Sequence, residues 1–428
     1  MSPRHAADPA PRAVRHARRL RSHRVARAVA LLATAGLSFG ATGLAAAYVN
    51  IEGNISTADI SHLTGDRPQG GATSNPDDPD AGQPINLLVM GSDVRDGENA
   101  TIGGDVEGMR SDTTILVHIS AQRDRVELVS IPRDSHVEIP ECERGDGSTT
   151  RARDTRFNEA FSLGGQSGEV TDAAACTIRT VQSLTGVAID RWVVVDFAGF
   201  ISMVDALGGI PMCIPADMRS AEAGLDITAG QHVLDGPTAL ALARARKGVG
   251  LGDGSDTGRV ERQQQLLAAT VNEVLSKNLL TDFPALYRFL TAATRSLTSD
   301  PVTGNITTLA GLAYSLRGVP SGNIHFMTVP FGSYGPDPNQ VEWTDDADLI
   351  FERIAADEPV VAQAPVAGPT PTEGTGGTDG TEGTPGTDTG TDDGTGTDGT
   401  DGTGGTPDPS TEPTVDTITP DDVTTVCG

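Results

Sequence analysis

The chain has 428 residues and a formal net charge of −27, which is unevenly distributed. The first 27 residues carry eight arginines and one aspartate, whereas residues 358–428 carry 14 carboxylates and no lysine or arginine. This length suits two average domains, or one large domain with appendages. The acidic end argues against a nucleic acid as the main partner.

A basic segment, residues 1–27, is followed directly by the uncharged residues 28–49. A helix of this length could cross a hydrocarbon core of about 30 Å. Because positive flanks favour the cytoplasmic side, we expect a signal-anchor in the cell membrane, with a cytoplasmic N-terminus and an extracytoplasmic domain. A cleaved signal peptide is the alternative, since Ala45-Ala46-Ala47 is similar to a small-residue cleavage site.

The segment 50–83 is rich in Gly, Pro, Asp, Ser and Thr, and is expected to be a flexible extracytoplasmic linker. Apolar periodicity then predicts strands at 85–90, 113–119, 126–131, 192–195 and 324–329. It predicts helices at 172–184, 197–207, 259–275, 280–297 and 306–316. Mixed strands and helices over residues 84–357 predict a single α/β domain.

Residues 358–428 consist mainly of Thr, Gly, Asp and Pro, with almost no aromatic or large apolar residue. Such a segment cannot bury enough surface to offset the entropy of ordering, so we predict a disordered acidic tail. The tail nevertheless ends in Val426-Cys427-Gly428.

The four cysteines are Cys142, Cys176, Cys213 and Cys427. An even number in an exported domain suggests disulfides, and three pairings are possible. We favour Cys142 with Cys176, because both flank the loop that leads into the helix at Asp172, which leaves Cys213 with Cys427. Free buried thiols are the alternative. No Cys/His spacing suggests a zinc site.

Charged clusters lie at the ends of several predicted elements. They are Gly91-Ser92-Asp93-Val94-Arg95, Arg110-Ser111-Asp112, Ser130-Ile131-Pro132-Arg133-Asp134, and the neighbouring stretches 243–247 and 258–264. Ligands of open α/β sheets tend to lie at strand ends, and the guanidinium group matches phosphate oxygens. Paired carboxylates suit a hard divalent cation. Together the clusters predict a site for Mg²⁺ and a pyrophosphate, although each alone could be a turn pair or a solvated helix end.

Seven stretches together resemble the LytR-CpsA-Psr family. They are INLLVMGSDVR (85–95), RSDTTILVHI (110–119), VSIPRD (129–134), RFNEAFSLGG (156–165), VVVDFAGFISMVDALGGI (193–210), LDGPTALALARAR (234–246) and GRVERQQ (258–264). They follow the family's order across nearly the whole globular segment. The resemblance implies a central mixed β-sheet flanked by helices, with an apolar cavity for a polyprenyl tail.

The resemblance also implies a phosphotransferase that moves a glycopolymer from a polyprenyl-pyrophosphate carrier to the muramic acid C6 hydroxyl of peptidoglycan, forming a phosphodiester. Asp93 and Asp112 would bind Mg²⁺ (or Mn²⁺), Arg133 would be essential for catalysis, and Asp93 could accept or orient the hydroxyl proton. The residues implied to hold the pyrophosphate are Arg95, Arg133, Arg156, Arg244, Arg246, Arg259 and Gln263. Arg156 stands where the family often has lysine, which keeps the charge but changes the donor geometry.

Two other functions stay open. A polyprenyl-pyrophosphate pyrophosphatase would use the same residues with water in place of the sugar hydroxyl. A non-catalytic regulator that binds lipid-linked precursors would need no turnover. The sequence does not identify which glycopolymer is transferred.

Overall fold

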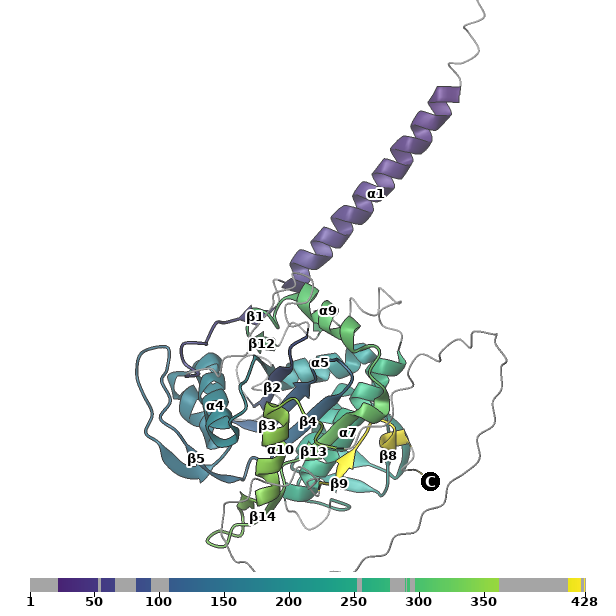
Figure 1. Ribbon diagram of the computed structural model, residues 1–428. Helices are drawn as coiled ribbons and strands as arrows, with labels where there is room; N and C mark the ends of the chain where they lie inside the picture. Colours follow the sequence, from purple (N-terminus) through teal and green to yellow (C-terminus); the bar gives the residue numbers. More distant parts are fainter. Residues whose placement is uncertain are drawn as a thin grey trace, which may run out of the picture.

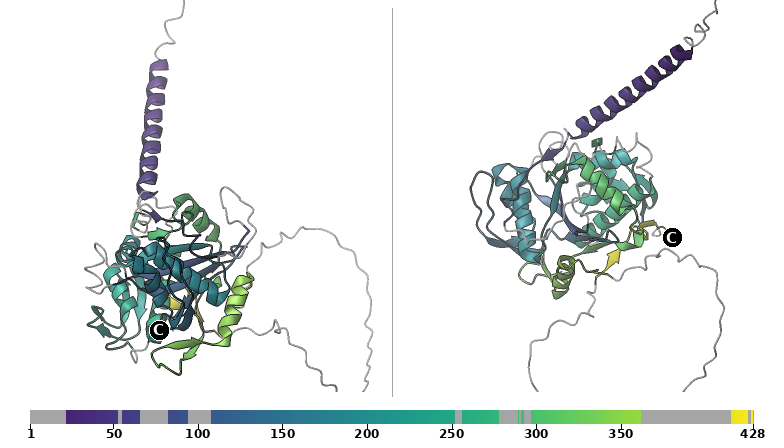
Figure 2. Two further views of the ribbon diagram at one scale, coloured as in Figure 1. Left: turned by 90° about the vertical axis from the view of Figure 1, so that its left-hand side faces the viewer. Right: turned by 45° about the horizontal axis from the view of Figure 1, so that its top comes forward.

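The computed structural model describes residues 22–52, 55–65, 82–93, 108–251, 256–277, 289, 291–292, 297–361, 415–424 and 427. These residues form a mixed α/β domain, from which helix α1 (Ser22–Glu52) extends (Figures 1 and 2). The predicted fold class, a central mixed sheet flanked by helices, is confirmed.

Among the described residues, eight strands form the central sheet in the order β1-β12-β7-β2-β3-β4-β13-β16. They are β1 (Ser56–Thr57), β2 (Ile85–Ser92), β3 (Ser111–Ile119), β4 (Val126–Ile131), β7 (Arg191–Asp196), β12 (Leu297–Ser299), β13 (Ile324–Thr328) and β16 (Thr417–Ile418). Strands β2, β3 and β4 form an antiparallel meander, whereas β7 runs parallel to β2 and β13 parallel to β4. The last residues of β2, β4, β7 and β13 therefore lie together with the first residues of β3. We call this the carboxyl end of the sheet.

Helices cover both faces of this sheet (Figure 2). They are α3 (Glu159–Gly164), α4 (Val170–Thr185), α5 (Phe197–Leu207), α6 (Gly236–Arg244), α7 (Asp256–Ser276), α9 (Ile306–Leu316) and α10 (Asp345–Ala355), with 3-10 turns η1 (Gly165–Ser167), η2 (Ser321–Asn323) and η3 (Asp422–Thr424). Successive strand side chains point to opposite faces. Thus Met327 packs into the cluster with α3, α4 and α10, and its neighbour Phe326 packs into the cluster with α5, α6 and α7.

Further two-stranded antiparallel sheets accompany the central sheet. They are β5 (His136–Ile139) with β6 (Arg153–Arg156), β8 (Ile210–Ile214) with β11 (Gly230–Leu234), β9 (Met218–Ser220) with β10 (Leu225–Ile227), and β14 (Phe331–Ser333) with β15 (Val341–Trp343). None of these strand pairs, nor α3, α6 and α10, was predicted. The predicted helices 197–207 and 306–316 and the predicted strand 126–131 have the observed bounds. The predicted helix 280–297 lies largely outside the described residues, and it is wrong at Leu297, where β12 begins.

Residues 28–49 are helical, as part of α1. Within the part of the chain that the structure describes, however, no helix is both long enough and apolar enough to cross a membrane. The structure therefore does not support the predicted membrane span.

The C-terminal prediction is wrong at both ends of the supposed tail. At its start, Val360 is 1% exposed and its backbone N–H donates to Glu127 (2.7 Å). Near its end, β16 pairs with β13, with Ile418 opposite Phe326, and Val423 is buried. Few apolar residues suffice here because they pack against a preformed core. Residues 362–414 lie outside the described residues.

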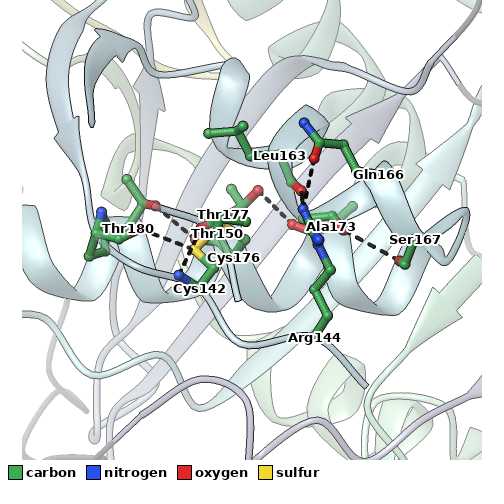
Figure 3. Close-up of a disulfide and its surroundings, with 12 residues drawn as sticks. Cys142, Arg144, Thr150, Leu163, Gln166, Ser167, Ala173, Cys176, Thr177 and Thr180 are labelled. Atoms are coloured by element: carbon green, nitrogen blue, oxygen red, sulfur yellow. Dashed lines mark hydrogen bonds between the residues drawn. A yellow bond between two sulfur atoms is a disulfide. The ribbon is translucent and has the colours of Figure 1, made fainter. Parts of the chain in front are cut away.

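Both favoured cysteine pairings are confirmed. Cys142, after β5, is bonded to Cys176 on α4, with Cα atoms 5.3 Å apart (Figure 3). The Cys142 backbone also exchanges hydrogen bonds with Thr150 (2.9 and 2.8 Å). Cys213 on β8 is bonded to Cys427, with Cα atoms 5.5 Å apart. The second bond attaches Cys427 to the two-stranded sheet of β8 and β11.

A buried polar network lies at the end of the sheet opposite the carboxyl end. His118 of β3 is 0% exposed, and its Nδ1 lies 2.7 Å from the Asn86 Oδ1 of β2. The Nε2 atom of His118 faces Asp357 (3.1 Å), and Arg125 donates to the same carboxylate (2.7 Å). Glu127, also 0% exposed, completes the network beside Arg125 (3.5 Å). The network fastens the segment after α10 to the sheet.

The protonation of His118 gives a testable pH dependence. Burial, together with the nearby Arg125 charge, lowers the pKa of His118 from 6.5 to about 4. Between these values the unfolded chain binds a proton that the folded chain does not, so the free energy of unfolding falls as the pH falls. Wild type should lose about 2 kcal/mol more stability between pH 7 and pH 5 than His118→Gln does. Urea titrations at both pH values measure this difference, and equal losses would contradict the assignment.

Candidate functional site

The two predicted metal ligands lie on neighbouring strands at the carboxyl end of the sheet. In the β2–β3 pair, Gly91 faces Thr113 and Ser92 faces Ser111, so Asp112 is the extra residue of a β-bulge. A bulge redirects the side chain of its extra residue. Asp93 follows β2, and its Oδ1 accepts a hydrogen bond from the Arg110 backbone N–H (2.6 Å).

The donor set fits a hard cation. Asp112 is 35% exposed, and carboxylate oxygens are ligands that Mg²⁺ accepts alongside water and phosphate oxygens. Across the described residues, no group of three or more His, Cys, Asp or Glu side chains is arranged to hold a metal.

Arg133 is brought to Asp112 by the strand register. Thr114 of β3 faces Ile131 of β4, so two residues further on Arg133 faces Asp112. The Arg133 Nη1 donates to Asp112 Oδ1 (2.7 Å), and its Nε lies 3.3 Å from Asp134 Oδ2. The Arg133 side chain is 14% exposed. The structure thus places the predicted catalytic arginine between two carboxylates, one of them a predicted metal ligand.

Arg156 lies beside Arg133. It is the last residue of β6 and faces His136 of β5. Its Nε is 3.6 Å from Asp134 Oδ1, and its Nη2 is 3.6 Å from Asp337 Oδ2. The guanidinium at this position therefore belongs to the same group of charges, although the family often has lysine there.

The charged stretches 243–247 and 258–264, at the end of α6 and in α7, lie near the carboxyl end of the sheet, and Arg244 contacts Phe197 there. The guanidinium carbon of Arg244 lies 4.7 Å from the centre of the Phe197 ring. Phe197 directly follows Asp196, which pairs with Ser92 of β2. Gln264 of α7 donates to Thr328 (2.7 Å), the last residue of β13. Two helices are thus fixed at the end of the sheet that carries Asp93 and Arg133.

Gln263 and Arg262 fix the backbone around Arg244. The Gln263 Nε2 donates to the Ala243 carbonyl (2.9 Å), and the Arg262 Nη2 donates to the Ala245 carbonyl (2.6 Å). In this structure the Gln263 amide nitrogen therefore contacts protein backbone, which makes it a support for Arg244. Arg262 was not among the predicted residues.

The remaining predicted pyrophosphate ligands differ in exposure. Arg246 is half-buried, whereas the side chain of Arg259 is 2% exposed and enclosed by protein. Arg95 lies outside the described residues. The start of the Gly/Asp loop after Lys247 pairs with β9 through Arg219 and Val249. Gly248 is required there, because its φ is +147° and a Cβ would collide with the Arg219 carbonyl oxygen.

A sequence profile of the LytR_cpsA_psr family matches residues 47–348. The chain belongs to this family. A LytR-Csp2A-Psr enzyme from Actinomyces oris has the same fold, with a TM-score of 0.50 and 23% identity over 71% of this chain and 96% of that one.

Two relatives are similar to this chain in sequence. The cell wall biosynthesis protein LcpA of Corynebacterium glutamicum is 28% identical over 284 residues, which are 60% of this chain and 54% of that protein. The polyisoprenyl-teichoic acid–peptidoglycan teichoic acid transferase TagU of Enterococcus faecalis is 31% identical over 218 residues, 51% of this chain and 62% of that protein. The chain therefore spans less than two thirds of the length of either relative.

Two charged residues of this LytR_cpsA_psr domain lie in the site but were not predicted from the sequence, Asp134 and Asp337. Asp134 stands within the quoted VSIPRD stretch, but it was given no role. Asp337 lies between β14 and β15 in a Pro-Asp-Pro-Asn stretch that reads as an ordinary turn. Only the three-dimensional contact with Arg156 distinguishes it.

Proposed function

We propose that the protein is a phosphotransferase that moves a glycopolymer from a polyprenyl-pyrophosphate carrier to peptidoglycan. The observation that carries this proposal is the meeting of Asp93, Asp112 and Arg133 at the carboxyl end of the sheet. Two carboxylates and a fixed guanidinium are suited to a cation-bound pyrophosphate. The names of the relatives, cell wall biosynthesis protein and teichoic acid transferase, support the same class of reaction.

The carrier would place its polyprenyl chain against α5, α7 and α9. Apolar side chains of these helices are only partly buried, among them Phe200, Leu267, Leu312 and Leu316. Arg244 lies over Phe197 at the start of α5, so a cation stands where the apolar helices meet the charged site. An amphiphile with an anionic head and an apolar tail fits such a junction.

The reaction would begin with the acceptor hydroxyl beside Asp93, whose carboxylate accepts or orients its proton. The hydroxyl oxygen attacks the sugar-proximal phosphorus, and the bond to the bridging oxygen breaks, so polyprenyl phosphate leaves. Arg133 and Arg156 stabilise the negative charge that grows on this leaving group. Mg²⁺ held by Asp93 and Asp112 would supply further charge neutralisation.

This reaction would take place outside the cytoplasm. The disulfides Cys142–Cys176 and Cys213–Cys427 favour an oxidising compartment. Lipid-linked glycan and peptidoglycan are both available there. The transfer needs no ATP, because cleavage of the pyrophosphate bond supplies the driving force.

The test is to incubate the full-length chain with a defined polyprenyl-pyrophosphate glycan, Mg²⁺ and peptidoglycan. Mass spectrometry of digested peptidoglycan should find the glycan linked through a phosphodiester to muramic acid. Release of glycan phosphate at the same rate without peptidoglycan would identify a pyrophosphatase instead. Tight lipid binding without turnover, unchanged in Asp93→Ala, would identify a regulator.

A further inference from the structure

Five charged side chains form a continuous series from the carboxyl end of the sheet to the β14–β15 loop. In order they are Asp112, Arg133, Asp134, Arg156 and Asp337. The signs alternate, so each arginine lies between two carboxylates. Asp134, at the centre, is shared: its Oδ2 faces the Nε of Arg133 and its Oδ1 faces the Nε of Arg156.

This arrangement fixes which side of each guanidinium is occupied. Asp134 approaches both arginines at Nε, the atom nearest the side-chain stem. Asp112 and Asp337 approach the outer nitrogens instead, at Arg133 Nη1 (2.7 Å) and Arg156 Nη2 (3.6 Å), so each guanidinium is held from two sides by carboxylates. Arginine binds phosphate oxygens in the plane of its guanidinium, so the orientation of this plane decides how a phosphate is met. Asp134 is 15% exposed, which limits screening of its charge by solvent.

The outer end of the series is held by the β14–β15 hairpin. Asp337 accepts hydrogen bonds from the Asn339 backbone N–H and the Gln340 side chain (both 2.9 Å). Gln340 in turn contacts His136 Nδ1 (2.9 Å), and the first residue of β15, Val341, donates its backbone N–H to the Asp134 carbonyl (3.1 Å). The hairpin therefore supports both Asp134 and Arg156.

We propose that Asp134 is a positioning residue that holds Arg133 and Arg156 at a fixed spacing, so that both meet the same pyrophosphate group. Asp337 supports Arg156 from the hairpin side. This inference rests on the proposed function, because it assigns the two arginines to one ligand. Asp134 would contribute by orienting the two arginines. Its loss should therefore lower the rate of the chemical step more than the affinity for the carrier.

Asp134→Asn in the full-length chain keeps the shape of the side chain but removes its charge. We expect kcat for glycan transfer to fall about 100-fold, the cost of misplacing a catalytic group by about 1 Å, with KM for the carrier changed by less than about threefold. Asp134→Glu should recover part of kcat, and Asp337→Asn should reduce it about tenfold. The matched control is Asp226→Asn, which removes an exposed carboxylate paired with Arg219. It should match wild type.

Crystal structures of wild type and Asp134→Asn separate this inference from the proposed function. The Arg133 and Arg156 guanidinium groups should move apart in the variant while the sheet is unchanged. An unchanged arginine geometry, an unchanged kcat, or a raised KM with normal kcat would each overturn the inference. If Asp134→Asn melts at a much lower temperature than wild type, the crystal structure, kcat and KM of Asp337→Asn test the inference in its place. Failure of wild type to transfer glycan would reject the proposed function, and the arginine geometry would still decide the positioning role.

Discussion

Arg133→Ala is expected to lower the rate of glycan transfer by about 10³-fold, the loss typical of removing one preorganised group that stabilises transition-state charge. The guanidinium is held by Asp112 and Asp134, so it needs no reorganisation when charge develops on the leaving phosphate. Arg133→Lys should recover little of this rate, because a single ammonium cannot replace a planar fork held by two carboxylates. Single-turnover assays with saturating carrier measure the chemical step directly.

The matched control for this variant is Arg219→Ala. Arg219 also pairs with an aspartate, but its side chain is 62% exposed on β9. It should transfer glycan at the wild-type rate. Thermal melting of both variants checks that the fold is retained. Transfer by Arg133→Ala near the wild-type rate would remove Arg133 from the catalytic role.

The second large effect is expected at the opposite end of the sheet, where Glu127→Ala should destabilise the folded chain by about 3–5 kcal/mol. Glu127 is 0% exposed and accepts the backbone N–H of Val360 (2.7 Å). Its removal leaves Arg125, which is 4% exposed, with one carboxylate fewer, and leaves the Val360 N–H without this acceptor. Burial raises the pKa of Glu127, because the charged carboxylate loses its solvation, while the Val360 hydrogen bond and the Arg125 charge act in the opposite direction.

Glu127→Gln separates these contributions, since it keeps an acceptor oxygen of the same shape. We expect it to lose less than half as much stability as Glu127→Ala. Glu342→Ala, at an exposed position of β15, is the control and should change stability little. Urea denaturation of the full-length chain gives the three values, and a loss below about 1 kcal/mol in Glu127→Ala would contradict the predicted role of the network.

Local signals made the central elements predictable. Helix α5 has the predicted bounds, and Gly208-Gly209 marked its end: Gly208 adopts the left-handed conformation there. The structure adds that Asp196 caps its first turn by accepting the Gly199 N–H (2.7 Å). The meeting of Asp112 and Arg133 also follows from sequence, since both flank a meander of neighbouring strands. Helix α10 could have been found: Asp345, Asp346 and Asp348 in its first turn and Arg353 in its last suit the helix dipole.

Long-range contacts account for most of what was missed. Strand β16 has only two residues, and its order depends on β13, about ninety positions earlier in the chain. The contact of Asp337 with Arg156 likewise joins segments that no local pattern relates. The burial of Arg259 and the backbone contact of Gln263 depend on how α7 packs against the end of α6.

The fastened C-terminus changes the geometry of the acidic segment between Val361 and Val415, both of which pack against the same core cluster. A free tail of this length could reach about 180 Å from its root, but a chain that must return to its starting point reaches only about 90 Å, whatever its conformation. Chain length alone therefore keeps the ten carboxylates between residues 362 and 414 within about 90 Å of that cluster. A single cut close to Val415 would raise this limit to about 180 Å for the segment before the cut, whereas a cut near the middle would leave it at about 90 Å. The C-terminal fragment would stay attached through Cys213–Cys427 until that bond is reduced.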